Sequence, residues 1–197
     1  MLSIFGFQLT AANGAQVLVH GLPAPVLSAS PTEIDLIVPF GAANGDGTPT
    51  NVQLVLPNSS TQVQAPSILN VALITTDGSH AAALNQDGTV NSAANPAKRG
   101  SVVSLFGTGL NGWPADKADG ALAKAAEPLD QFYSKLEAFD ISGVPINVLY
   151  LGTAPGLLYG VFQINLQLPL NANTLSGEEI YVMSGSTRSK TVEIYVQ

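Results

Sequence analysis

Strict alternation of apolar and polar residues is the strongest signal along the chain. In the segment 163–169, three large apolar residues alternate with three amide residues before a proline: Gln163, Ile164, Asn165, Leu166, Gln167, Leu168 and Pro169. A period of two is typical of a strand with one buried face, and proline ends such a strand because it has no N–H to donate. The segment 33–39 also has large apolar residues at every second position, Ile34, Leu36 and Val38, and the same final proline. We therefore expect one β unit that is used twice.

Other short motifs recur in the same order. The segment 2–10 matches 103–111 through a shared Ser-x-Phe-Gly sequence, and the Gly-Leu-Pro turn at 21–23 matches Gly-Val-Pro at 143–145. Val17 and Val19 precede the first turn. At the same spacing, Phe139 and Ile141 precede the second, and we match the two pairs. Ordered recurrence of this kind indicates a tandem duplication.

The duplication sets the predicted domain boundaries. The first repeat covers 1–71, the second covers 100–197 with an insertion at 112–134, and 72–99 is a β-hairpin or extended arm between them. Glycine (19) and proline (13) are frequent, which favours many short strands and tight turns over long helices. About seven strands per repeat, with turns roughly every 8–12 residues, predict an all-β chain of two tandem immunoglobulin-like β-sandwiches.

The charge pattern excludes several classes of function. Charged residues make up only 11% of the chain, the formal net charge is −7, and the seven Lys and Arg residues form no cluster. A nucleic-acid surface would need a basic stripe, and binding to an anionic membrane would need basic residues too. No apolar run approaches the roughly 18 residues of a membrane span, so no membrane insertion is predicted. The absence of cysteine excludes disulfides and thiolate metal sites.

No catalytic constellation is visible in the sequence. The two histidines, His20 and His80, lack further ligands at the spacing that a structural metal needs, and no Gly-x-Ser-x-Gly elbow occurs. The acidic residues of the insertion could pair for glycoside hydrolysis, but a solvated loop explains them more simply: Asp116, Asp119, Glu127 and Asp130. We predict that the protein is not an enzyme and uses no metal and no cofactor.

The segment Asn85 to Asn91 resembles a calcium loop in having oxygen side chains at alternate positions around a central glycine. The terminal bidentate carboxylate of such a loop is missing from 92–95. A tight Asp-Gly turn capped by asparagine side chains explains the same residues and is the favoured interpretation, with calcium as the alternative.

Five segments carry a resemblance to a known family: 21–27, 83–97, 102–110, 154–157 and 162–165. On the basis of these segments, the whole chain resembles a family of secreted C-terminal β-domains of unknown function from Acidobacteria of the Solibacter type. The paired repeats are also similar to IPT/TIG domains, the immunoglobulin-like modules of surface proteins. The resemblance implies an exported, non-catalytic bacterial module that is extracellular or at the cell surface, and it implies no site residues.

Members of that family usually carry a further segment before the first Ser-Ile-Phe-Gly strand, whereas this chain starts almost inside that strand. We therefore expect the first repeat to have an unfilled sheet edge, which a strand from another chain could complete. The candidate interaction residues are apolar or aromatic side chains near this edge and in the two insertions of the second repeat: Leu2, Ile4, Phe7, Leu9, Trp113 and Tyr159.

Two functions follow from these expectations. The first is a structural and interaction module, either a spacer at the cell surface or an adhesion-type subunit that self-assembles by strand exchange, with filaments as one outcome. The alternative is a carbohydrate-binding module, in which aromatic rings stack on sugars. Its candidate platform is Trp113, Tyr133, Tyr150 and Tyr159. Tyr159 has a second interpretation, because it lies in the apolar loop 154–160, for which burial at the junction of the repeats is the favoured prediction.

Overall fold

The structure is a computed structural model, and it describes residues 2–6, 9, 16–42, 49–56, 59–65, 71–110, 117–129, 136–173 and 177–197. The regular elements of these residues are strands, apart from one short 3-10 helix, η1 (Phe40–Ala42). The prediction of an all-β chain is therefore confirmed. Within the same residues no helix is long and apolar enough to cross a membrane. The chain forms two compact units, the first from 1–69 with 111–121 and the second from 70–110 with 122–197.

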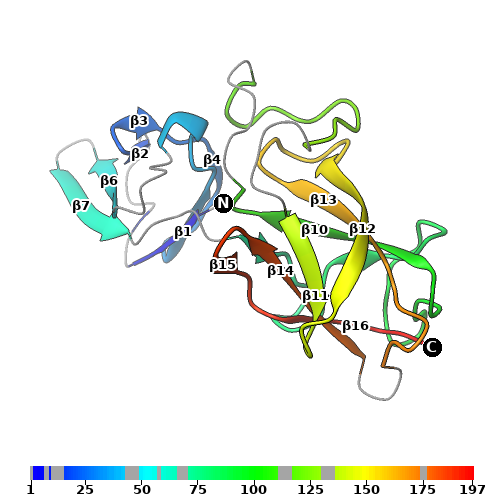
Figure 1. The fold of residues 1–197 in the computed structure, drawn as a ribbon. Helices are drawn as coiled ribbons and strands as arrows, with labels where there is room; N and C mark the ends of the chain where they lie inside the picture. The colour runs from blue at the N-terminus through cyan, green and yellow to red at the C-terminus, as the bar shows by residue number, and fades with distance from the viewer. Residues whose placement is uncertain are drawn as a thin grey trace. The chain divides into compact units, whose positions relative to one another are not determined.

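The first unit contains two antiparallel sheets (Figure 1). The three-stranded sheet has the order β1 (Leu2–Phe5), β5 (Glu33–Leu36), β4 (Val26–Ala29). The four-stranded sheet has the order β3 (Leu22–Pro23), β2 (Gln16–Val19), β6 (Thr50–Leu56), β7 (Ser59–Ala65). One core cluster contains buried side chains of both sheets, including Val17, Val52, Ile34 and Leu36, so the two sheets pack against each other.

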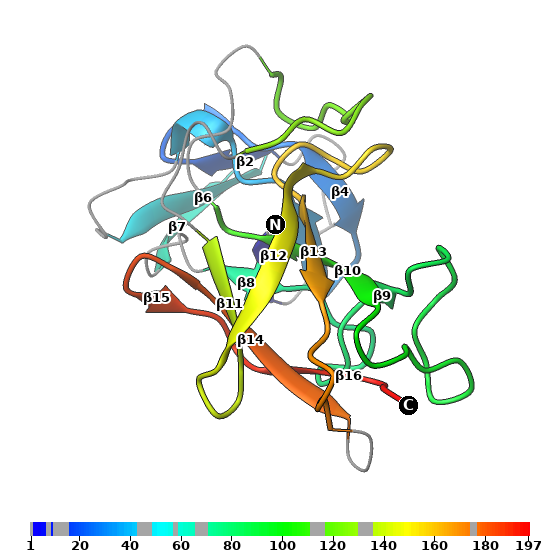
Figure 2. The same cartoon turned by 45° about the vertical axis from the view of Figure 1, so that its right-hand side comes forward.

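The second unit is built on one nine-stranded antiparallel sheet. Its main path runs β15 (Thr187–Arg188), β14 (Glu178–Ser184), β11 (Leu136–Asp140), β12 (Pro145–Thr153), β13 (Phe162–Gln167), β10 (Val102–Thr108), β8 (Ala72–Leu73). Two further strands pair off this path, β16 (Val192–Ile194) with β14 and β9 (Ala83–Leu84) with β10. Strands β12, β13 and β10 run side by side in both views of the ribbon (Figures 1 and 2).

The two ends of this sheet are linked by short bridges, so the second unit is nearly closed like a barrel. Next to β8, the N–H of Ala82 donates to the carbonyl of Ile74 over 2.8 Å. On the other side of that turn, the N–H of Ala81 donates to the carbonyl of Glu193 in β16 over 2.9 Å. The predicted arm 72–99 therefore contributes β8, β9 and the closing bridges to the second unit.

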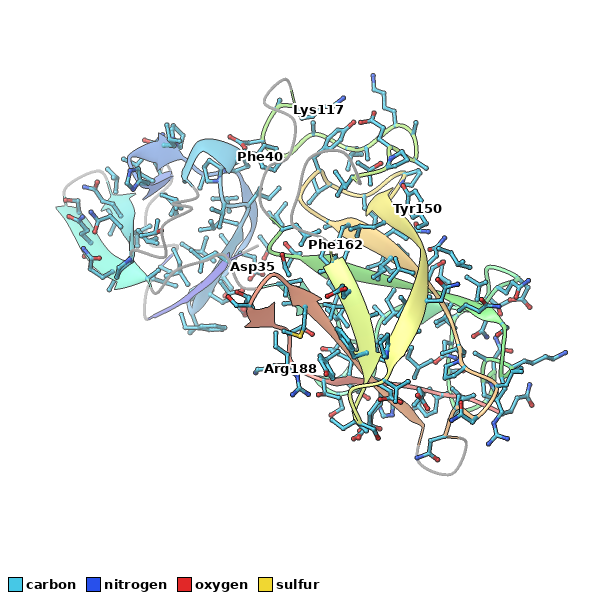
Figure 3. All side chains as sticks on the ribbon, viewed as in Figure 1. Asp35, Phe40, Lys117, Tyr150, Phe162 and Arg188 are labelled. Carbon is cyan, nitrogen blue, oxygen red and sulfur yellow. The ribbon has the colours of Figure 1, made fainter. Side chains whose placement is uncertain are left out.

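The alternation predicted for 163–168 is confirmed in β13, where Ile164 and Leu166 are 0% exposed and Leu168 is 1% exposed. The core of the second unit contains these residues together with other fully buried side chains: Phe162, Leu105, Val103, Ile180, Val182 and Ile194. The Phe162 ring (labelled in Figure 3) packs directly on Gly107 of β10, leaving no room for a side chain there.

The pairing scheme of the first unit recurs in the second. Strands β1, β5 and β4 correspond to β10, β13 and β12, and β2, β6 and β7 correspond to β11, β14 and β15. The register recurs too, since Ser3 faces Asp35 as Ser104 faces Asn165. A bulge follows Val26 in β4, and another follows Val148 at the corresponding place in β12. This residue-by-residue agreement supports the duplication predicted from the sequence.

One part of the sequence match is shifted by a residue. Leu18 faces Pro23 across the first hairpin, whereas Phe139 faces Pro145 across the second. The second hairpin is therefore one residue longer than the first, where His20 (φ 52°) and Gly21 (φ 79°) form a two-residue turn with both residues in the left-handed region. Val17 and Val19 consequently correspond to Ala138 and Asp140, and the match with Phe139 and Ile141 is wrong by one position.

The insertion predicted at 112–134 is divided between the two units. In the first unit, the Asp119 carboxylate accepts a 2.8 Å hydrogen bond from the N–H of Phe40. In the second unit, Leu129 donates to the carbonyl of Leu151 over 3.0 Å, and Pro128 forms a bridge with Gly152. The later part of the insertion thus pairs with the end of β12.

Candidate functional site

Strand β1 lies at the edge of the three-stranded sheet, with β5 as its neighbour on one side. The N–H of Gly6 donates to the carbonyl of Thr32 over 3.0 Å, continuing the register in which Ile4 faces Ile34. In an antiparallel pair, alternate residues direct their backbone groups to opposite sides. Ile4 therefore bonds to β5, whereas the N–H and C=O groups of Ser3 and Phe5 point outward. Within the described part of the chain these outward groups have no strand partner.

A carboxylate bound by two serines connects the strands of this sheet. Asp35 of β5 lies between β1 and β4 (labelled in Figure 3), and its two oxygens accept hydrogen bonds from Ser3 Oγ at 2.6 Å and Ser28 Oγ at 2.7 Å. The Ser3 hydroxyl, and then the Ser28 hydroxyl, lower the pKa of Asp35 below its usual value. Because the charged form accepts both bonds, this contact holds β1 in register at neutral pH.

The corresponding edge in the second unit is covered. Leu84 of β9 pairs with Ser104, and the N–H of Ile74 donates to the carbonyl of Phe106 over 2.8 Å. Ser104 and Phe106 occupy the positions of Ser3 and Phe5. The same two backbone positions are thus bonded to residues of the arm in one unit and left open in the other.

The edge of β1 carries few of the features that usually protect a sheet edge. It is regular over its four residues, and it contains no lysine, proline or bulge. Phe5 presents a ring that is 74% exposed. The other edge of the same sheet, β4, is interrupted by the bulge after Val26. We therefore take the outer edge of β1, defined by Ser3 and Phe5, as the candidate interaction site.

The predicted interaction residues are distributed differently from the expectation. Leu2 and Ile4 are partly buried against the core cluster of the first unit, and Leu9, at 8% exposure, belongs to that cluster. Tyr159 is buried in the second unit, and its hydroxyl lies 3.3 Å from an oxygen of Glu127. Phe7 and Trp113 lie outside the described residues. Ser3 and Phe5 were not predicted, because the outward backbone groups follow from the register with β5, which the sequence alone does not give.

The aromatic platform proposed for carbohydrate is only partly described. Tyr133 lies with Trp113 outside the described residues. The Tyr150 hydroxyl (labelled in Figure 3) donates to the carbonyl of Thr153 over 2.9 Å, and burial is the main cause that raises the pKa of Tyr150. Tyr159 is buried, so of this set only the half-buried Tyr150 is left among the described residues.

His80 has partners that its sequence neighbours did not reveal. Its Nδ1 lies 2.6 Å from Asp77 Oδ2, its Nε2 lies 3.5 Å from Glu193 Oε2, and its ring stacks on Tyr195 with centroids 4.4 Å apart. Backbone N–H groups of His80 and Ser79, followed by the His80 ring, lower the pKa of Asp77 to about 2. This cluster fastens the turn 76–80 to the end of β16. Among the described residues no group of three or more His, Asp or Glu side chains is arranged to hold a metal ion.

The side chains of the calcium-like segment bond to one another and to the chain around them. Asp87 accepts hydrogen bonds from the N–H and the hydroxyl of Thr89, at 3.0 and 2.6 Å. Asn91 donates to Asn85 Oδ1 over 3.0 Å and forms two bonds with the backbone of Tyr195. These oxygens serve a capped turn that is attached to the C-terminal residues of the second unit.

The acidic residues of the insertion are separated. Asp119 bonds to Phe40 in the first unit, and Glu127 accepts from Tyr159 in the second. Asp116 and Asp130 lie outside the described residues.

Comparison with protein-family models, curated proteins and solved structures gives no match for this chain.

Proposed function

We propose that the protein is a non-catalytic structural and interaction module, outside the bacterial cell or at its surface, that binds a partner protein by accepting a β-strand along β1. The observation that carries the proposal is the contrast between β1 and β10. The strands share one register, yet among the described residues only β10 has its outer edge covered by a further part of the same chain. Main-chain hydrogen bonds to an added strand are a common basis of peptide recognition.

The residues that cover β10 indicate the chemistry of the donated strand. They are small or apolar and uncharged: Ala72, Leu73, Ile74, Ala83 and Leu84. They pair antiparallel to β10. We infer that the partner donates an antiparallel, uncharged strand of small and apolar residues. These segments of the chain are already bonded to β10, so we infer that the strand added to β1 comes from another chain.

We further propose that both units are variants of the immunoglobulin-like, IPT/TIG-like sandwich and that the chain belongs with the exported bacterial family it resembles. The first unit supports this with seven strands in two sheets around one core. The second unit departs from that plan, since its corresponding strands form one nearly closed sheet. The second unit has the same strand register as the first, and for this reason we treat it as a modified copy of the same module.

A labelled peptide with the sequence of residues 71–76 tests strand donation. We expect it to bind the full chain, because it carries the side chains that pair with β10. Phe5→Pro removes an outward N–H that the fold does not use, and Phe5→Ala removes the same exposed ring but keeps the N–H. Fluorescence anisotropy should show binding to the wild type and to Phe5→Ala, with an affinity at least about tenfold lower for Phe5→Pro.

Amide exchange provides a second readout that needs no variant. Bound peptide should slow the exchange of the Ser3 and Phe5 amides, because their N–H groups then have acceptors. Equal binding by the two Phe5 variants, or peptide binding that leaves both amides unprotected, would refute the proposal.

A further inference from the structure

Strand β7 forms a second open edge, at the end of the four-stranded sheet of the first unit (Figure 1). Its seven residues pair with β6 at every position without a bulge. The side chains of 60–64 are exposed. Within the described part of the chain, β6 is the only strand that pairs with β7.

The register of the sheet shows which backbone groups of β7 point outward. The carbonyl of Asn51 accepts a 2.8 Å hydrogen bond from the N–H of His20, so Asn51 and every second residue of β6 bond toward β2. The intervening residues of β6 bond toward β7. Because Val52 faces Val63 and Leu54 faces Thr61, residues 61 and 63 bond to β6. Ser60, Gln62 and Gln64 therefore direct their N–H and C=O groups away from the sheet.

The composition of this edge is unusual for a chain with a net charge of −7. No Asp, Glu, Lys, Arg or His occurs between Asp46 and Asp77, a range that includes all of β6 and β7. Proteins commonly protect an open edge with a charge, a proline or a bulge, and the strand Ser59–Ala65 has none of these. A second copy of the strand could therefore approach without meeting a like charge.

We propose that two copies of this chain associate by antiparallel pairing of β7 with β7 about a twofold axis at Gln62. Gln62 then faces Gln62 of the second copy, and Ser60 faces Gln64. The three facing pairs supply about six backbone hydrogen bonds in an antiparallel ladder. Facing amide side chains add hydrogen bonds of the kind found in glutamine ladders. The contact is isologous, so it produces a closed dimer with a continuous eight-stranded sheet.

The β1 edge is less suited to such a dimer. Pairing β1 with itself would centre on Ile4 and involve only the outward groups of Ser3 and Phe5. It would also bring together two copies of Asp35 and Glu33, which neighbour β1 on β5. The dimer proposal is independent of strand donation at β1, because the two edges belong to different sheets.

Charge substitution at the twofold axis tests the proposal. Gln62→Lys and Gln62→Glu each place two like charges opposite one another, whereas Gln62→Ala leaves the edge uncharged. In sedimentation velocity, the wild type and Gln62→Ala should show concentration-dependent dimers. Each charged variant alone should associate at least about tenfold more weakly. An equimolar mixture of the two charged variants should recover the dimer as a heterodimer.

The result that overturns the proposal is a strictly monomeric wild type, or a Gln62→Lys variant that dimerises as strongly as Gln62→Ala. A mixture that fails to recover association also overturns it. Circular dichroism checks that each variant is folded, which is expected because residue 62 is exposed. Excess 71–76 peptide should leave the dimer intact, so failure of strand donation at β1 and failure of dimerisation at β7 are distinguishable.

Discussion

The two units follow one pairing scheme but differ in the connection that follows the first hairpin. In the first unit, Ala24 and Pro25 separate β3 from β4, and the two sheets remain distinct. In the second unit, the corresponding Ile146 and Asn147 lie within the unbroken β12, which joins both halves into one sheet. The carbonyl of Pro25 accepts a 2.9 Å bond from Ile37, but Pro25 has no N–H to return. A proline in place of an asparagine thus accompanies the change from one continuous sheet to two.

The units also differ in how their sheet edges are covered. In the second unit, residues of the arm pair with the outer edge of β10. Residues of the insertion pair with the end of β12. The three-stranded sheet of the first unit has neither cover within the described residues. Within the described residues the second unit is thus closed internally, and the first has the open edges on which both proposals depend.

The largest effect on stability is expected from adding a side chain at Gly107 in the second unit. An added methyl group in Gly107→Ala would overlap the Phe162 ring inside the packed core, which should cost about 2–3 kcal/mol of stability. The corresponding Gly6→Ala meets the buried Leu9 side chain, whose Cδ2 lies 2.8 Å from the new carbon, which is a smaller overlap and should cost less. Urea denaturation of both variants measures the difference. Equal losses of stability in the two variants would contradict the difference in packing around the two glycines.

The next effect concerns the strand that joins the sheets. Asn147→Pro should remove a ladder hydrogen bond to Gln167 and interrupt β12, at a cost of about 2 kcal/mol. The reverse change, Pro25→Asn, should alter the stability of the first unit by less than about 1 kcal/mol, because a restored donor is offset by a more flexible unfolded chain. Denaturation and amide exchange at Gln167 test the pair. An Asn147→Pro variant as stable as the wild type would refute the role assigned to this residue.

A smaller loss is expected from opening the covered edge. Ile74→Pro removes the N–H that bonds to Phe106, which should cost about 1 kcal/mol and accelerate amide exchange at Ser104 and Phe106. Ile74→Ala keeps that N–H and is the matched control. In the wild type, Ser3 and Phe5 should already exchange much faster than Ser104 and Phe106. Similar protection at the two pairs would remove the main difference between the units.

The smallest effect is acid sensitivity confined to one sheet. The hydroxyls of Ser3 and Ser28 lower the pKa of Asp35 in the folded state, so their stabilisation is present above the unfolded value, about 3.9, and is lost as the pH falls through the folded value. Asp35→Asn should abolish this dependence in the first unit. The second unit has Asn165 at the corresponding position, which does not titrate. Asp77 and other acids titrate in both proteins, so a stability difference between wild type and Asp35→Asn that stays constant from pH 5 to pH 2 would argue against the contact.

Local patterns predicted the strands well. The alternation around Ile164 and Ile34 identified both central strands and their buried faces, because strand periodicity depends only on neighbouring residues. The recurrence of Ser-x-Phe-Gly identified the pair β1 and β10, whose registers agree. The one-residue error in the hairpin arose because loop length is not encoded by the flanking apolar residues.

Contacts between distant residues could not be predicted in the same way. His80 meets Glu193, and Asn91 bonds to the backbone of Tyr195, only because the sheet closes on itself. The capped turn around Asp87 was predicted from its own residues, whereas its attachment to Tyr195 through Asn91 has no local signal. The open edge itself was expected near Leu2 and Leu9, but the pairing with β5 was needed to assign the outward groups to Ser3 and Phe5.

The attachment of Asn91 to Tyr195 determines when the second unit can finish folding. Its side chain both accepts from the Tyr195 N–H, at 3.0 Å, and donates to the Tyr195 carbonyl, at 2.8 Å, across 104 residues of sequence. During synthesis on the ribosome, the segment around Asn91 emerges long before its partner. Contacts of such high sequence separation form late and slow the search for the native state. We therefore expect the second unit to complete its folding late, because the segment around Asn91 can form these bonds only after Tyr195 has been synthesised.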